Sequence, residues 1–174
     1  MDALLQTERL LLRPHRPEDA PFMVTLNADP AVTRYTGDAP FSGPAAAMPV
    51  IAALRAEWDA HRTGRLVVVE RSTGAPVGFC GLKMEPEGGC ADLGYRFLQS
   101  RWGRGYATEA GGACVRYGFE VLGLARLVAR VIPENTGSVR VLQKLGFQRV
   151  GPTRCAGEAA DLYQRSRGGK FITV

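Results

Sequence analysis

The segment from Trp102 to Ala110, WGRGYATEA, constrains this chain more than any other. It follows a strand-like stretch and begins a helical one, and Gly103 and Gly105 allow a tight turn with uncovered amides. The first N–H groups of a helix have no partner within the helix, and the helix dipole is positive at that end. The segment therefore indicates a pocket for an anion, best a phosphate or pyrophosphate.

Two glycines one residue apart are a weak signal alone, because a plain strand-to-helix turn can share them. The segment lacks the GxxxxGK[ST] pattern of a nucleoside-triphosphate loop. It also lacks the third glycine of a dinucleotide-binding fingerprint, and the preceding strands do not have βαβ spacing. Neither of these two nucleotide-binding classes is indicated.

The apolar pattern along the chain predicts one domain over residues 1–174, with no repeat or linker. Helical spacing covers residues 18–27, 45–61, 106–122 and 136–145, and we expect Pro49 in the first turn of the second helix. Strand patterns cover residues 9–13, 66–70, 77–82, 91–98, 127–132, 147–150 and 162 onward. The predicted fold class is α/β (α+β), a mixed and mostly antiparallel central sheet of six to seven strands flanked by about four helices.

Composition narrows the possible environments and partners. The net charge is +5, but the arginines are scattered, so no nucleic-acid stripe is indicated. No apolar run is long enough to cross a bilayer and the start does not resemble a signal peptide, so we expect a cytoplasmic protein with no membrane partner. The four cysteines form no CxxC pair and lie far in sequence from the two histidines; we expect free thiols and no metal.

Several motifs in a fixed order closely resemble the GNAT superfamily of N-acetyltransferases, in particular its ribosomal-protein N-terminal acetyltransferase branch. They are ADLGYRF at residues 91–97, the glycine turn with its YATEA helix start, PENTGS at residues 133–138 and KLGF at residues 144–147. The resemblance extends from Arg9 to about Tyr163. It implies acetyl-CoA as co-substrate and direct transfer of the acetyl group, in a ternary complex, to a primary amine on a protein N-terminus or a small molecule.

The resemblance also implies which residues bind the coenzyme. The turn would bind the pyrophosphate of acetyl-CoA through backbone amides, and the strand before it would pair with the pantetheine arm. Trp102 stands where most of the superfamily has Gln or Arg, as is usual in this branch. The implied cofactor-binding residues are Tyr95, Phe97, Trp102, Gly103, Arg104, Gly105, Tyr106, Ala107 and Asn135, and Asn135 is also an apt helix N-cap.

The catalytic candidates are Asp92 and Ser138. Asp92 lies in an otherwise apolar strand and could take the ammonium proton through a water; the alternative is a side chain that faces solvent by strand alternation. Many superfamily members use a tyrosine as the acid, but the matching position here is Leu142. Ser138 could instead hydrogen-bond to the departing sulfur, or simply support the start of the helix.

Other residues have weaker claims. Glu85 and Glu87 are less favoured base candidates, and Glu109 suits a structural role at a helix start. Tyr35 could cover the acceptor side or pack in the core. A CoA-binding sensor or interaction module without turnover is the alternative function, and the chain could be a monomer or a homodimer.

Overall fold

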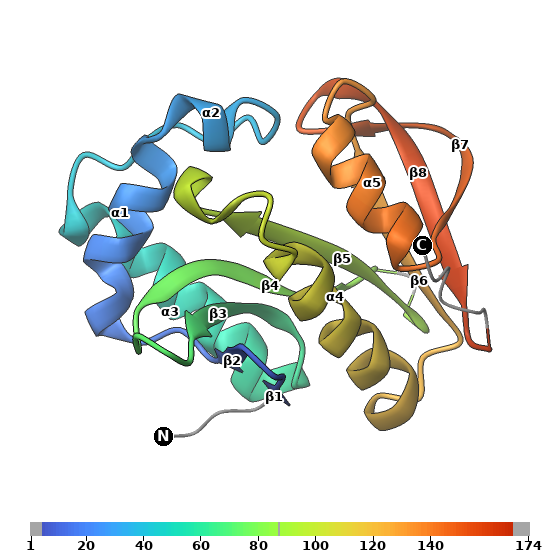
Figure 1. Cartoon of the computed structure of the whole chain (residues 1–174), viewed down its shortest axis with the longest axis horizontal. Helices are drawn as coiled ribbons and strands as arrows, with labels where there is room; N and C mark the ends of the chain where they lie inside the picture. Colours follow the sequence, from blue (N-terminus) through green and yellow to red (C-terminus); the bar gives the residue numbers. More distant parts are fainter. Residues whose placement is uncertain (1–4, 87, 169–174) are drawn as a thin grey trace.

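The computed structural model describes residues 5–86 and 88–168, and its centre is a single sheet (Figure 1). Within these residues the sheet has eight strands in the order β1-β2-β3-β4-β5-β6-β8-β7. Neighbouring strands are antiparallel except β5 and β6, which are parallel. The strands are β1 (Leu5–Gln6), β2 (Leu10–Arg13), β3 (Gly64–Glu70), β4 (Pro76–Met84), β5 (Cys90–Phe97), β6 (Arg126–Val131), β7 (Gln148–Cys155) and β8 (Glu158–Ser166).

Five α-helices in the described residues flank the sheet. They are α1 (Ala20–Ala28), α2 (Pro30–Thr33), α3 (Pro44–His61), α4 (Tyr106–Arg116) and α5 (Thr136–Lys144). The predicted class, a mixed and mostly antiparallel sheet with flanking helices, is confirmed. The observed counts exceed the predicted ones because β1 has two residues and α2 four, too few to show a periodic apolar pattern.

The position of Pro49 differs from the expectation. It lies inside α3 rather than in the first turn, because the helix already begins at Pro44. Pro44 occupies the first helical position, where a missing N–H costs little. Pro49 is exposed, and α3 continues past it with the loss of one backbone hydrogen bond.

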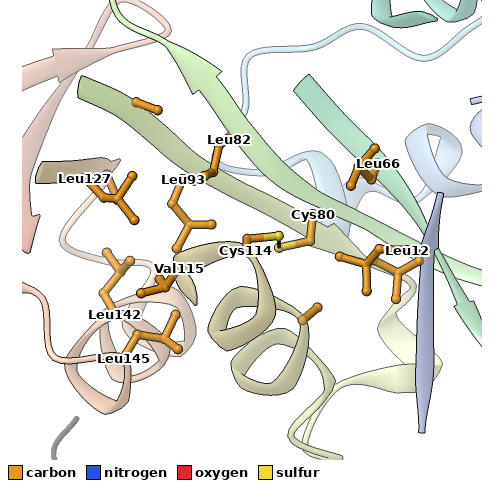
Figure 2. Packing of buried hydrophobic residues seen from close by; sticks show 14 of the residues in the cluster. Leu12, Leu66, Cys80, Leu82, Leu93, Cys114, Val115, Leu127, Leu142 and Leu145 are labelled. Atoms are coloured by element: carbon orange, nitrogen blue, oxygen red, sulfur yellow. Dashed lines mark hydrogen bonds between the residues drawn. The ribbon is translucent and has the colours of Figure 1, made fainter. Parts of the chain in front are cut away.

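The main core lies between the sheet and α4 (Figure 2). Leu82 and Leu93 of the sheet face Val115 of α4, and Leu142 of α5 and Leu145, the residue after α5, close the same cluster. Each large apolar side chain buried this way contributes about 1.5–3 kcal/mol. A separate small cluster joins α1 to α3 through Ala20, Met23, Ala47 and Ile51.

Strand β5 presents different chemistry on its two faces, and this positions the site. Ala91, Leu93 and Phe97 are buried in the core cluster, and Tyr95 packs against it. Successive side chains of a strand point to opposite faces. Asp92, Gly94 and Arg96 therefore lie on the other face of the sheet.

Candidate functional site

β5 and β6 pair only at their beginnings. The described ladder joins Cys90 and Asp92 of β5 to Arg126 and Val128 of β6, and it ends there. Beyond this point the two strands do not continue the ladder, and residues 93–96 of β5 and 129–131 of β6 line a cavity. The sheet is therefore open at its centre, between two strands that begin side by side.

This cavity has a volume of about 620 Å³, within the range of about 300–1,000 Å³ typical of small-molecule sites. Residues from β3 to β7, α5 and the segment after α2 contribute to it. Its polar and charged lining residues are Tyr35, Thr36, Arg65, Lys83, Glu85, Asp92, Tyr95, Arg96, Arg130, Asn135, Ser138 and Cys155.

The main chain of β5 offers hydrogen-bonding groups to this opening. The amides of Leu98 and Glu85 donate to the carbonyls of Val77 and Cys90, which fixes the even-numbered residues of β5 as those bonded to β4. In an antiparallel ladder the alternate residues direct their N–H and C=O groups to the other side. The main-chain groups of Tyr95 and Phe97 thus face the opening. The carbonyl of Phe97 already accepts from the indole N–H of Trp102, at 2.9 Å.

The glycine turn lies just beyond the end of β5. Gly103 and Gly105 have φ angles of 73° and 79°, in the left-handed region that favours glycine. Trp102, Gly103, Arg104 and Gly105 are exposed. Gly105 is the N-cap of α4 and has no side chain to accept from the first amides of the helix, and the first intrahelical bond runs from Glu109 to Gly105. The early amides of α4 are therefore available to an anion.

Side chains beside the turn hold it in place. Glu109 accepts from the hydroxyl of Thr7 at 2.5 Å and from the amide of Arg9 at 2.9 Å, and its carboxylate pairs with the Arg9 guanidinium. These bonds lower the pKa of Glu109 despite its partial burial. Arg9 also donates to the carbonyl of Arg104 at 2.9 Å and lies over the ring of Tyr106. This agrees with the structural role predicted for Glu109.

The side chain of Tyr106 is directed into the protein. It is buried, and its hydroxyl donates to Glu70 of β3, which lowers the pKa of that carboxyl. Arg101 also pairs with Glu70, at 3.4 Å. Tyr106 can therefore reach a ligand of the turn only through its main chain, as the resemblance implies.

Asp92 faces the cavity but not as a free carboxylate. Its Oδ1 lies 2.6 Å from Nη2 of Arg65, and its Oδ2 lies 3.3 Å from Nη1 of Arg130. Arg65 also donates to the carbonyls of Gly81 and Asp92, at 2.6 and 2.8 Å. The side chains of Asp92 and Arg65 are 16% and 19% exposed, so Asp92 is not simply a solvent-facing side chain.

Glu85 shares the same network. Its two carboxylate oxygens accept from both terminal nitrogens of Arg130, at 2.8 and 2.7 Å. This bidentate pair lowers the pKa of Glu85. Glu87, the other weaker base candidate, lies outside the described residues.

The start of α5 forms the opposite wall of the cavity. Asn135 is the N-cap, and its Oδ1 accepts from the amide of Ser138 at 3.2 Å, so the predicted capping role is confirmed. The hydroxyl of Tyr95 crosses the opening to donate to the carbonyl of Ser138, at 3.0 Å. Burial raises the pKa of Tyr95, so its phenol stays protonated. Leu142 is buried and also lines the cavity.

Tyr35 is partly buried and lines the cavity. Its hydroxyl donates to the carbonyl of Glu134, at 3.3 Å. The residue thus connects the segment after α2 to the loop before α5. Of the two roles considered for Tyr35, the geometry favours covering the cavity.

Six of the polar and charged lining residues had no place in the predicted site: Thr36, Arg65, Lys83, Arg96, Arg130 and Cys155. Arg65 and Arg130 lie 27 and 38 positions from Asp92, so only the strand order brings them together. The available signal was an arginine within or directly next to an apolar strand pattern, Arg130 in residues 127–132 and Arg65 before residues 66–70.

Other classes of site receive no support from the described part of the chain. It contains no group of three or more His, Cys, Asp or Glu side chains that could hold a metal ion. No helix in it is both long and apolar enough to cross a membrane. All four cysteines are free thiols, as predicted.

Comparison with known proteins decides the family. A model of the acetyltransferase (GNAT) domain matches residues 9–148. The chain belongs to the GNAT acetyltransferase family. An uncharacterized N-acetyltransferase of Bacillus licheniformis, p20, is 35% identical over 93% of this chain and 94% of its own length.

Solved structures agree with this assignment. An acetyltransferase from Agrobacterium tumefaciens superposes with a TM-score of 0.78 at 30% identity, covering 94% of both chains. The ribosomal-protein-S5-alanine acetyltransferase of Vibrio fischeri gives a TM-score of 0.80 over 95% of this chain and 97% of its own, but at 20% identity this likeness shows the fold alone. As a GNAT member, the chain is an acetyl-CoA-dependent acyltransferase that acts on an amine.

Proposed function

We propose that this GNAT protein transfers an acetyl group directly from acetyl-CoA to a primary amine, with both substrates held in the cavity between β5 and β6. The observation that carries the proposal is the position of the amide-rich turn at the end of β5, next to the opening between these strands. A pyrophosphate at the turn and a pantetheine arm along Tyr95 and Phe97 would bring the thioester into the cavity. Holding two reactants together supplies much of the acceleration in such a reaction.

Coenzyme binding is tested by a glycine substitution. Gly105→Val forces a β-branched residue to φ 79° at the turn, so it should abolish the rise in melting temperature that CoA causes in the parent. Gly74→Val is a matched control, because Gly74 also has a positive φ (70°) and open space around it, but lies in the β3–β4 turn. Equal CoA binding by Gly105→Val and the parent would contradict the proposed pyrophosphate site.

Direct transfer requires the amine nitrogen to attack the thioester carbonyl. The N–C bond forms, the C–S bond breaks, the amine loses a proton and the thiolate of CoA gains one. The competing route passes through an acyl-cysteine. Cys155 is the only one of the four cysteines in the cavity lining, and burial raises its pKa, which disfavours the thiolate. Cys155→Ala should therefore keep near-parent turnover, and loss of turnover with CoA binding intact would favour the acyl-cysteine route.

Ser138 is proposed to hydrogen-bond to the departing sulfur. It lines the cavity at the start of α5, where the helix dipole also favours negative charge. Ser138→Ala should lower kcat with little change in CoA affinity, because the interaction forms only as the thiolate leaves. An unchanged kcat would limit Ser138 to its backbone contacts with Asn135 and Tyr95.

A further inference from the structure

The charges around the cavity are unequal. Four cationic side chains line it, Arg65, Lys83, Arg96 and Arg130, against two carboxylates, Glu85 and Asp92. The carboxylates are paired with Arg65 and Arg130. Arg96 contacts Asn27 and Asp38, and Asp38 is 55% exposed and does not itself line the cavity. Lys83 is therefore the cavity cation with no ion pair among the described residues.

Lys83 lies where an acceptor substrate could reach it. It is exposed on β4 and stands directly opposite Asp92 in the β4–β5 register, so both side chains share one face of the sheet. The carboxylate of Asp92 already pairs with Arg65 and Arg130. The Lys83 ammonium is therefore available to an anionic group of a bound substrate. A polyamine would need the opposite arrangement, with carboxylates that are not already paired.

The same network leaves the cavity without a free base. Protonating Asp92 or Glu85 would disrupt their arginine pairs, and the cavity lining contains no histidine. Besides Lys83, the remaining titratable lining groups are Tyr35, Tyr95 and Cys155. An acceptor that supplies its own neutral amine is therefore favoured. At pH 7.5 roughly a third of a peptide's N-terminal α-amine is neutral, against about 0.1% of a lysine-type amine, a difference of about 200-fold.

We propose that the acceptor is the α-amine of a peptide whose first residue carries a carboxylate, and that Lys83 binds this carboxylate. The inference rests on the proposed function, whose acceptor it specifies. A polyamine or a lysine side chain fits neither the excess of positive charge nor the absence of a free base.

The test compares four acceptors in a CoA-thiol release assay: a tripeptide amide that begins with Asp, its Asn analogue, free aspartate and spermidine. The parent should prefer the Asp peptide to the Asn peptide by about tenfold in kcat/KM, as a charge-assisted hydrogen bond to an exposed group allows. Free aspartate has the carboxylate but a more basic α-amine than a peptide, so it should be a poorer acceptor than the Asp peptide, and greater activity with free aspartate would overturn the inference. Spermidine should be the poorest acceptor, and equal or greater activity with spermidine would overturn the inference.

Lys83 is tested with matched variants. Lys83→Gln should reduce the Asp-to-Asn ratio to near one, Lys83→Arg should keep most of it, and Lys144→Gln should leave it unchanged. Lys144 is the control because it is an exposed lysine at the end of α5, outside the cavity lining. An unchanged ratio in Lys83→Gln would overturn the role of Lys83.

Equilibrium binding separates this inference from the proposed function. Calorimetry with the CoA-loaded protein should show the same Asp-over-Asn preference and its loss in Lys83→Gln. If no acceptor releases CoA but this binding pattern is present, acetyl transfer fails while carboxylate recognition stands. If CoA is released with no preference in rate or binding, acetyl transfer stands and this inference fails.

Discussion

The substitution Asp92→Asn distinguishes between two roles of Asp92, that of a catalytic base and that of a partner in an ion-pair network. The substitution keeps the shape of the side chain but removes its charge, so Arg65 and Arg130 lose an anionic partner at 2.6 and 3.3 Å. Removing one member of a fully buried pair costs about 3–5 kcal/mol, and of an exposed pair about 0–1 kcal/mol.

The expected loss of stability lies between these limits. Asp92 and Arg65 are 16% and 19% exposed, and Arg65 keeps two carbonyl acceptors while Arg130 keeps Glu85. We expect a loss of about 2 kcal/mol, which lowers the Tm of a chain of this size by about 4–8 °C. Asp59→Asn is the control, because Asp59 pairs with Arg55 at 3.3 Å on the surface of α3, and its Tm should change by less than about 2 °C.

The pH dependence of kcat/KM then distinguishes between the two roles of Asp92. If Asp92 belongs to the network, kcat/KM of Asp92→Asn should fall less than about tenfold, by a factor that does not depend on pH. If it is the base, kcat/KM should fall by about 100-fold at neutral pH and recover as the free amine becomes abundant. A large loss that recovers at high pH, with the Tm unchanged, would refute the network role.

Three further predictions concern groups outside this network. Burial lowers the pKa of His15 from 6.5 to about 4. Between these two pH values the unfolded chain binds a proton that the folded chain does not, so the free energy of unfolding decreases as the pH is lowered. The unfolding free energy should drop by about 2 kcal/mol from pH 7 to pH 5 through this group, and urea titrations of His15→Gln should lack that part of the drop; an equal drop in both proteins would contradict it. A thiol reagent should modify Cys155 first in the native protein, since the other three cysteines are buried, and should find four thiols after denaturation without reductant; fewer than four would indicate a disulfide. Tyr95→Phe removes the hydrogen bond to the Ser138 carbonyl and should cost about 1 kcal/mol, or about 3 °C in Tm; an unchanged scanning-calorimetry profile would show that this bond adds nothing.

The features that could be predicted from the sequence are those determined by residues close together in the chain. Gly103 and Gly105 adopt the positive φ angles that a tight turn before a helix requires, and Asn135 caps α5 as its residue type suggests. The periodic apolar patterns gave the long strands and helices to within a few residues at most ends. Gly146, with φ 78°, follows the end of α5 as expected for a helix C-terminus.

The parts that could not be predicted depend on strand order and register. Asp92 was a single acid in an apolar strand, and nothing near it in sequence indicates that Arg65 and Arg130 flank it. The contact from Tyr95 to α5 likewise spans 43 positions. The chemistry of a residue in the open centre of this sheet is set by partners on other strands, which periodicity does not identify.

The central claim, acetyl transfer to an amine in the cavity between β5 and β6, is tested most directly by product stoichiometry. The protein is incubated with acetyl-CoA and the tripeptide amide that begins with Asp, and released CoA and acetylated peptide are measured together by mass spectrometry. The account predicts equal amounts of the two products, dependent on the protein and lost in Gly105→Val. Release of CoA without acetylated peptide, or an undiminished yield from Gly105→Val, would contradict it.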